Sequence, residues 1–89
     1  MTQFEIKDGV AIIPEGTTEI PFRAFINCED LTTVVIPDSV MCIVNGAFFG
    51  CSSLTEVVIP NSVTSIGAGA FSRCYSLNDI FIPNIVTLI

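Results

Sequence analysis

Histidine and tryptophan are absent from this sequence of 89 residues, and basic residues are scarce: Lys7, Arg23 and Arg73 stand against nine acidic residues. Without histidine, the side chain most often used for acid–base catalysis near neutral pH is missing. Three separated cations in a chain of net charge −6 do not form the basic patch that binds nucleic-acid phosphates. The composition therefore argues against an enzyme and against a nucleic-acid-binding protein.

Long apolar runs are missing as well. No stretch approaches the roughly 20 consecutive apolar residues that span a bilayer. The first ten residues, MTQFEIKDGV, lack the cationic and apolar regions of a secretory signal peptide. We therefore expect no membrane insertion. The default location is cytoplasmic, and the cell surface is the alternative if the chain is a fragment of a longer protein.

A 23-residue period runs through the chain. Prolines recur at this interval, each after an isoleucine, at Pro14, Pro37, Pro60 and Pro83. The same interval links further columns: Ile20, Ile43, Ile66 and Ile89; Ala24, Ala47 and Ala70; Phe25, Phe48 and Phe71; Cys28, Cys51 and Cys74; Leu31, Leu54 and Leu77. A single repeat cannot bury its own apolar face, whereas stacked repeats share a continuous core. The columns therefore predict a repeat solenoid.

One repeat, residues 54–76, illustrates the local structure that we expect. Its start predicts a short strand that places three apolar residues inward, namely Leu54, Val57 and Ile59. The proline that follows cannot donate a ladder hydrogen bond and ends the strand. A second short extended segment is expected over residues 63–66. The apolar spacing within residues 69–74 predicts one or two helical turns.

These residues resemble the BspA-type leucine-rich repeat, whose pattern is L-x-x-I-x-I-P-x-x-V-x-x-I-x-x-x-A-F-x-x-C-x-x-L. Residues 54–77 fit it at essentially every defined position, and residues 31–54 fit almost as well. The resemblance implies an α/β-type repeat solenoid: a short leucine-rich-repeat stack with a parallel sheet, short extended segments and short helical turns. It also implies a role in adhesion or protein–protein contact, and it offers no catalytic residues to transfer.

We expect a single leucine-rich-repeat domain over residues 1–89. Residues 1–9 are predicted to form an N-terminal hairpin cap, with Lys7-Asp8-Gly9 at the turn. The repeats are predicted at about 10–32, 33–55 and 56–78, followed by a partial repeat over 79–89.

Cysteine chemistry is the remaining route to a reactive or metal site. One column contains Cys28, Cys51 and Cys74, whose parallel Cβ vectors do not suit a disulfide. Zinc requires four ligands at tetrahedral angles, and the chain offers neither histidine nor a C-x-x-C motif. We interpret the column as buried structural thiols, and we expect no metal, cofactor or catalytic residue. The fourth cysteine, Cys42, replaces Glu19 and Ser65 of other repeats, which predicts an exposed thiol.

The outward-facing side of the predicted strands is the candidate binding surface. Its apolar column contains Ile12, Val35, Val58 and Phe81, and its polar column contains Thr33, Glu56 and Asp79. An exposed apolar stripe flanked by polar residues is typical of a protein-binding surface, although β-branched residues also simply suit strands. We interpret Glu56 and Asp79 as solvated charges. The leading hypothesis is a non-catalytic protein-interaction module with a protein partner of unknown identity.

Two alternatives stay open. The chain could be a self-associating structural unit that pairs through its C-terminal edge, where the apolar residues are Ile80, Ile82, Val86 and Leu88. It could also be a fragment of a longer, adhesin-like surface repeat protein.

Overall fold

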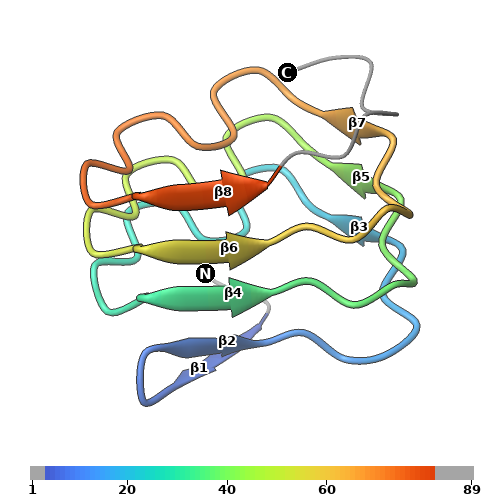
Figure 1. Cartoon of the computed structure of the whole chain (residues 1–89), viewed down its shortest axis with the longest axis horizontal. Coiled ribbons are helices and arrows are strands. Elements are labelled where there is room, and N and C mark those ends of the chain that lie inside the picture. Colours follow the sequence, from blue (N-terminus) through green and yellow to red (C-terminus); the bar gives the residue numbers. More distant parts are fainter. Residues whose placement is uncertain (1–3, 82–89) are drawn as a thin grey trace.

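A computed structural model describes residues 4–81, apart from the side chains of Asp79 and Phe81. The chain winds as a solenoid in which each repeat contributes one strand to each of two sheets (Figure 1). The strands are β1 (Glu5–Lys7), β2 (Val10–Ile12), β3 (Glu19–Ile20), β4 (Thr33–Val35), β5 (Cys42–Ile43), β6 (Glu56–Val58), β7 (Ser65–Ile66) and β8 (Asp79–Phe81). The predicted repeat solenoid with a parallel sheet is confirmed.

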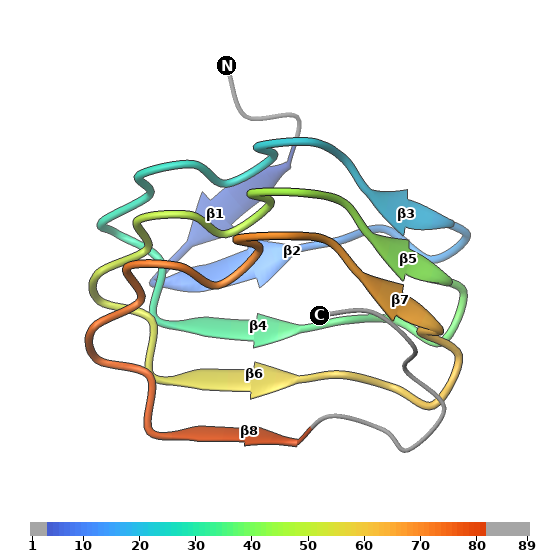
Figure 2. The same cartoon turned by 90° about the horizontal axis from the view of Figure 1, so that it is seen from above.

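The larger sheet has the order β1-β2-β4-β6-β8, and the smaller sheet has the order β3-β5-β7. All pairs except β1–β2 are parallel, and each residue faces the residue 23 positions later, as Val35 faces Val58 and Ile43 faces Ile66. Seen from above, the two sheets and a run of turns form three separate sides of the solenoid (Figure 2). This register follows from the constant length of the repeats, which places equivalent positions of successive repeats next to one another.

The β1–β2 pair is an antiparallel hairpin in which Lys7 faces Val10. Its two turn residues, Asp8 and Gly9, have φ values of 53° and 82°. Positive φ at both central positions defines a turn that favours Asp-Gly and matches the twist of the flanking strands. The hairpin therefore adds an antiparallel edge strand to the first parallel strand of the larger sheet.

The expected helical turns are not formed, and the structure contains no helix within residues 4–81. Alternate amides of the first repeat, those of Ala24, Ile26 and Cys28, donate to the carbonyl three residues earlier. The amides between them, those of Phe25 and Asn27, donate at 2.7 Å to carbonyls of the next repeat. An α-helix would direct every amide to its own segment. The segment is instead a series of tight turns hydrogen-bonded to its neighbour.

Left-handed backbone conformations produce this series of turns. In one column, Arg23, Gly46 and Gly69 have φ values of 55°, 67° and 68°. In a second column, Asn27, Gly50 and Arg73 have φ values of 55°, 77° and 63°. Glycine is the residue that tolerates this region without steric cost. The two arginines adopt it at positions where other repeats have glycine or, at Asn27, asparagine.

The core lies between the two sheets and the turns, and its centre is a stack of phenylalanine rings. Ring centroids of Phe25 and Phe48 lie 5.1 Å apart, and those of Phe48 and Phe71 lie 5.2 Å apart, each pair tilted by only 3°. Phe4, from the segment before β1, extends the stack with a centroid distance of 5.6 Å to Phe25. The phenylalanine column is therefore the internal spine that the repeat predicted.

Part of the expected C-terminal structure lies outside the described residues. This applies to all of the partial repeat 79–89 beyond Phe81, and to Ile82, Val86 and Leu88 of the proposed self-association edge. Within the described part, no helix has the length and apolar character needed to cross a membrane.

Candidate functional site

The strand face is the outward side of β4 and β6, formed by Thr33, Val35, Glu56 and Val58, together with the backbone of β8 beside them. Successive strand residues point to opposite sides of a sheet, so the central residues Val34 and Val57 are buried while Val35 and Val58 are 55% and 45% exposed. Glu56 is exposed and Thr33 is half-buried. Successive strand residues therefore contribute alternately to the core and to the solvent-exposed surface.

Parallel pairing aligns the residues of the strand face. Thr33 pairs with Glu56 and Val35 pairs with Val58. In β8, the backbones of Asp79 and Phe81 pair with those of Glu56 and Val58, while the side chains of Asp79 and Phe81 are not described. The structure therefore brings the predicted site residues into two adjacent columns at the spacing of neighbouring strands.

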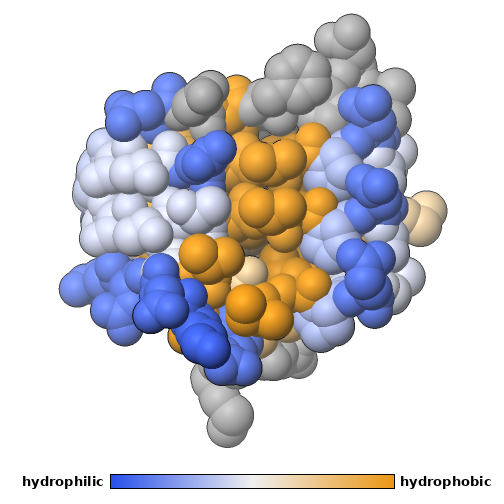
Figure 3. Space-filling model, turned by 60° about the horizontal axis from the view of Figure 1, so that its bottom comes forward, coloured by the Kyte–Doolittle hydropathy of each residue, from blue (hydrophilic) through white to orange (hydrophobic). Residues whose placement is uncertain are grey.

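The apolar column continues into the hairpin, as the position of Ile12 in the repeat predicts. Ile12 of β2 is 46% exposed and Val10 is 36% exposed, and Val10 pairs with Thr33. In the space-filling view of this side, apolar side chains form a continuous band with hydrophilic side chains on both flanks (Figure 3). An apolar band on three neighbouring strands is the clearest exposed hydrophobic feature of the sheets.

Threonine side chains next to the band have structural partners. The hydroxyl of Thr32 donates to the carbonyl of Gly9 at 3.0 Å, and that of Thr55 donates to the carbonyl of Thr32 at 3.1 Å. Each hydroxyl thereby satisfies a carbonyl of the preceding repeat. These threonines are exposed, yet their hydroxyls form hydrogen bonds that join successive repeats.

The cysteine column carries hydrogen bonds between repeats. The thiol of Cys51 donates to the carbonyl of Phe25 at 3.1 Å, and the thiol of Cys74 donates to the carbonyl of Phe48 at 3.2 Å. Desolvation on burial raises the pKa of Cys51 from 9.0 to about 12 and raises the pKa of Cys74 as well. A thiol with a raised pKa is a poor nucleophile. The expected structural role is therefore confirmed for Cys51, which is buried, whereas Cys28 and Cys74 are half-buried.

Cys42 differs from its expected position. It is half-buried rather than exposed, and its sulfur accepts a hydrogen bond from the hydroxyl of Ser65 at 3.4 Å. All four cysteines are free thiols. Within residues 4–81, no group of three or more cysteine, aspartate or glutamate side chains is placed to hold a metal ion.

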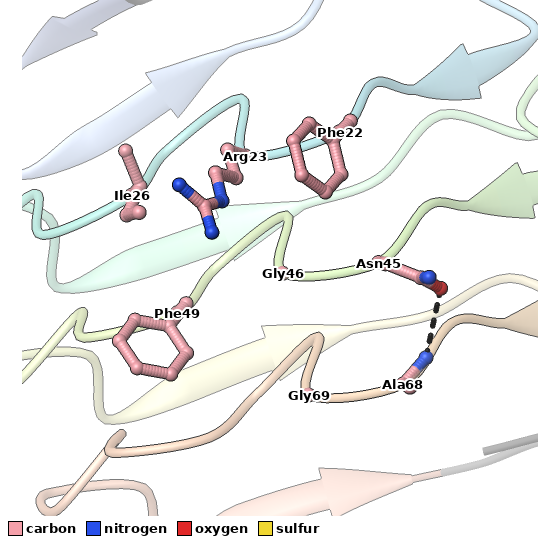
Figure 4. A pocket seen from close by; sticks show the side chains of 8 residues that line it. All are labelled: Phe22, Arg23, Ile26, Asn45, Gly46, Phe49, Ala68 and Gly69. Carbon is pink, nitrogen blue, oxygen red and sulfur yellow. Dashed lines mark hydrogen bonds between the residues drawn. The ribbon is translucent and has the colours of Figure 1, made fainter.

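A groove that no column of the repeat indicates lies on the turn side of the solenoid, and we call it the turn groove. It is open, has a volume of about 520 Å³, and takes its lining from three successive repeats: Phe22, Arg23, Ile26, Asn45, Gly46, Phe49, Ala68 and Gly69 (Figure 4). The carboxamide oxygen of Asn45 accepts a hydrogen bond from the amide of Ala68 at 2.9 Å, which fixes the side chain in the groove wall.

Two arginines stack on aromatic rings of the turn groove. The guanidinium carbon of Arg23 lies 5.0 Å from the ring centroid of Phe22, and that of Arg73 lies 5.6 Å from the ring centroid of Phe49. Phe22 is 61% exposed. Columns of identical residues revealed the core, but the groove residues change from repeat to repeat. The available signal was the presence of Arg23 and Arg73 in columns that otherwise contain mainly glycine.

Comparison with known proteins agrees with the geometry. Residues 4–89 match the family model of the BspA type leucine rich repeat region (6 copies). A leucine-rich repeat protein from Bacteroides ovatus is 38% identical, with a TM-score of 0.76 over 80% of this chain and 19% of that protein. The leucine rich repeat protein of T. pallidum is 27% identical, with a TM-score of 0.82 over 98% of this chain and 50% of that protein.

A leucine rich cell surface protein from Faecalibacterium prausnitzii is 43% identical, with a TM-score of 0.67 over 68% of this chain and 16% of that protein. The chain therefore spans between about a sixth and a half of the length of these relatives. No curated protein matches it. Because the family model covers nearly every residue, the chain belongs to the BspA-type leucine-rich repeat family.

Proposed function

We propose that this chain is a non-catalytic protein-interaction module that binds a protein partner through the strand face. The observation that carries this proposal is the exposed apolar band over three neighbouring strands, in which Ile12, Val35 and Val58 are each about half exposed. Repeats of this family typically mediate protein interactions and are generally non-catalytic. Exposed apolar patches rimmed by polar residues are typical of partner surfaces.

The geometry of the face supports the same conclusion. Hydrogen bonds between parallel strands hold Val35 and Val58 at a fixed separation, so little conformational freedom is lost when a partner binds. Glu56 adds a negative charge beside the band. A partner with an apolar patch and a neutral or basic rim would complement this surface, whereas nucleic acid would be repelled by the net charge of −6.

Lysine substitution of the band tests the proposal. Val35→Lys and Val58→Lys should preserve the fold, because both side chains are already about half exposed and lysine can extend into solvent. The variants should lose the partner that the unmodified chain retains in an affinity capture. Met41→Lys is the matched control, since Met41 is 58% exposed but precedes β5 on the smaller sheet. If both strand-face variants still capture the partner, the strand face is not the binding surface. The same conclusion follows if Met41→Lys loses the partner to the same extent.

A second proposal concerns the whole protein. We infer that the module is a unit of a longer repeat array at the cell surface, because one relative is named a leucine rich cell surface protein and this chain spans only 16% of it. The coding sequence on either side of this segment tests the inference. Further 23-residue repeats with a secretory signal would support it, and a flanking intracellular domain would contradict it.

A further inference from the structure

We propose that the turn groove binds an internal segment of a partner protein in which a bulky apolar side chain stands next to an aspartate or glutamate. This surface is separate from the strand face, since the groove is lined by the turns of three repeats and the strand face by β4, β6 and β8. The inference therefore does not depend on the function proposed above.

The lining of the turn groove defines the apolar part of the ligand. Four of its lining residues have apolar side chains, namely Phe22, Ile26, Phe49 and Ala68, and its volume of about 520 Å³ lies in the range typical of ligand sites. Gly46 and Gly69 have no side chains to fill the space between these groups. In Figure 4, Gly46 lies between the rings of Phe22 and Phe49, and Gly69 lies on the turn of the next repeat. The groove therefore has room for a large apolar side chain.

The charges around the turn groove define the polar part of the ligand. Arg23 and Arg73 are two of only three basic residues in a chain of net charge −6, and each stacks on a different phenylalanine of the groove. Among the residues that the structure describes, neither guanidinium forms a salt bridge or a hydrogen bond. Stacking fixes the planes of the guanidinium groups and leaves their N–H donors free for a carboxylate.

The backbone at these arginines supports a functional role. Arg23 and Arg73 have φ values of 55° and 63°, whereas the other repeats place Gly46 and Gly69, or Gly50 and Asn27, in the same columns. A left-handed conformation brings the Cβ atom close to a backbone carbonyl oxygen, so it is adopted most readily by glycine and, among residues with a side chain, by asparagine. Strain of this kind is concentrated at functional sites. Arginine at both positions is therefore explained by the surface that it creates rather than by the fold.

The dimensions of the groove favour a short extended segment. Its lining spans three repeats, and neighbouring repeats are spaced at about 4.8 Å, so the groove extends over about 10 Å. An extended peptide rises about 3.3 Å per residue, which places about three residues across the groove. Binding of a polyanion is disfavoured, because the groove offers only two cations and the chain as a whole has a net charge of −6.

Titration of the full chain, labelled with ¹⁵N, tests the proposal. The probe is the blocked peptide acetyl-glycyl-phenylalanyl-glutamyl-glycinamide, compared with its glutamine counterpart and with inorganic phosphate. A dissociation constant in the millimolar range is expected for a ligand of this size. The glutamate peptide should shift the amide signals of Arg23, Gly46 and Gly69 and should bind about 3- to 10-fold more tightly than the glutamine peptide.

Two variants with the same charge change separate the groove from general electrostatics. Arg23→Gly introduces the residue found in this column in the next two repeats, so the fold should be retained while the preference for glutamate over glutamine is lost. Lys7→Gln removes one cation in the hairpin, before the turn residues Asp8 and Gly9, and should leave the preference unchanged.

Several outcomes would overturn the proposal. These are equal binding of the glutamate and glutamine peptides, an unchanged preference in Arg23→Gly, and absence of shifts at the groove amides. Shifts at Val35 and Val58 alone would assign the peptide to the strand face instead. Inorganic phosphate that shifts the groove amides as strongly as the glutamate peptide would mark an unspecific anion site, which also contradicts the proposal.

Discussion

Burial of Cys51 in the core lowers the reactivity of its thiol. Its thiol is buried, donates to the carbonyl of Phe25, and has a pKa raised to about 12 by desolvation. Compared with a pKa of 9.0, this lowers the thiolate fraction at pH 8 about 1,000-fold. We expect iodoacetamide to modify Cys51 far more slowly in the native chain than in the unfolded chain, as mass spectrometry of timed samples can measure. Equal rates in both states would contradict the burial of this thiol.

The same thiol predicts how stability depends on pH. The folded chain keeps the Cys51 proton up to about pH 12, while the unfolded chain releases it near pH 9.0, so the unfolded state binds fewer protons between these values. The free energy of unfolding should therefore fall as pH rises above about 9. Chemical denaturation at a series of pH values measures this slope. Cys51→Ala should make the slope shallower, and an unchanged slope would show that other groups cause it.

Phe48 is the central residue of the aromatic stack, with rings of Phe25 and Phe71 on either side at 5.1 and 5.2 Å. Phe48→Ala removes both contacts and leaves a cavity between two repeats, which should lower the free energy of unfolding by about 3–5 kcal/mol. Urea denaturation measures the loss. Phe22→Ala is the control, because Phe22 is 61% exposed, and its effect should stay within about 0.5 kcal/mol.

At the scale of the element, the left-handed turns explain why residues 21–28, 44–51 and 67–74 form no helix. Gly46 and Arg23 occupy the same column, with φ values of 67° and 55°. Gly46→Ala should destabilise the fold by about 1–2 kcal/mol, because alanine is disfavoured in this region. Arg23→Gly should be neutral or stabilising, since it removes the same strain. Thermal unfolding of the two variants tests this opposition, and a shift in the same direction for both would refute it.

The turns also mark the limit of what the sequence predicts. Inward spacing of Ala70, Phe71 and Cys74 suits one turn of helix, but it equally suits a series of tight turns. What distinguishes them is the bonding of every second amide to the next repeat, as from Phe25 to Ala47. That interaction joins residues 22 positions apart, so a local pattern cannot reveal it. The strands of the larger sheet, in contrast, follow from the local L-x-x-L-x-L pattern of each repeat, and the parallel sheet that this pattern predicts is present.

The candidate surfaces differ in the same way. The strand face was foreseeable because Val35 and Val58 share a column and alternate with buried neighbours. The turn groove was not, because Phe22 and Phe49 belong to different columns and meet only when three repeats are stacked. Residues that recur in every repeat allow the core to be predicted from the sequence. Surface features such as the turn groove depend on residues that differ between repeats, so the repeat pattern does not predict them.

For the whole molecule, the decisive property is that each repeat pairs only with the repeats before and after it. The order β2-β4-β6-β8 in one sheet and β3-β5-β7 in the other keeps every pairing at a separation of 23 residues. Stability in such a stack is approximately the sum of the terms for each repeat and for each interface between neighbours. Inserting one repeat in register should therefore increase the free energy of unfolding by the term for one repeat plus the term for one interface.

Duplication of residues 33–55 within the chain tests this property. The insertion keeps the phenylalanine, cysteine and strand columns in register, because the strands pair at 23 residues. The free energy of unfolding should rise, and the denaturant m-value should increase by about a quarter, because it scales with the surface exposed on unfolding.

Duplication of residues 33–54 is the matched control, since it differs by a single residue. It shifts Leu54 by one position relative to the strand that follows, and a shift of one residue in a strand exchanges the inner and outer faces. The shorter insertion should therefore give no increase in stability or m-value. If both insertions behaved alike, the 23-residue register would not determine the stack, and the assignment of inner and outer columns that depends on it would have to be abandoned.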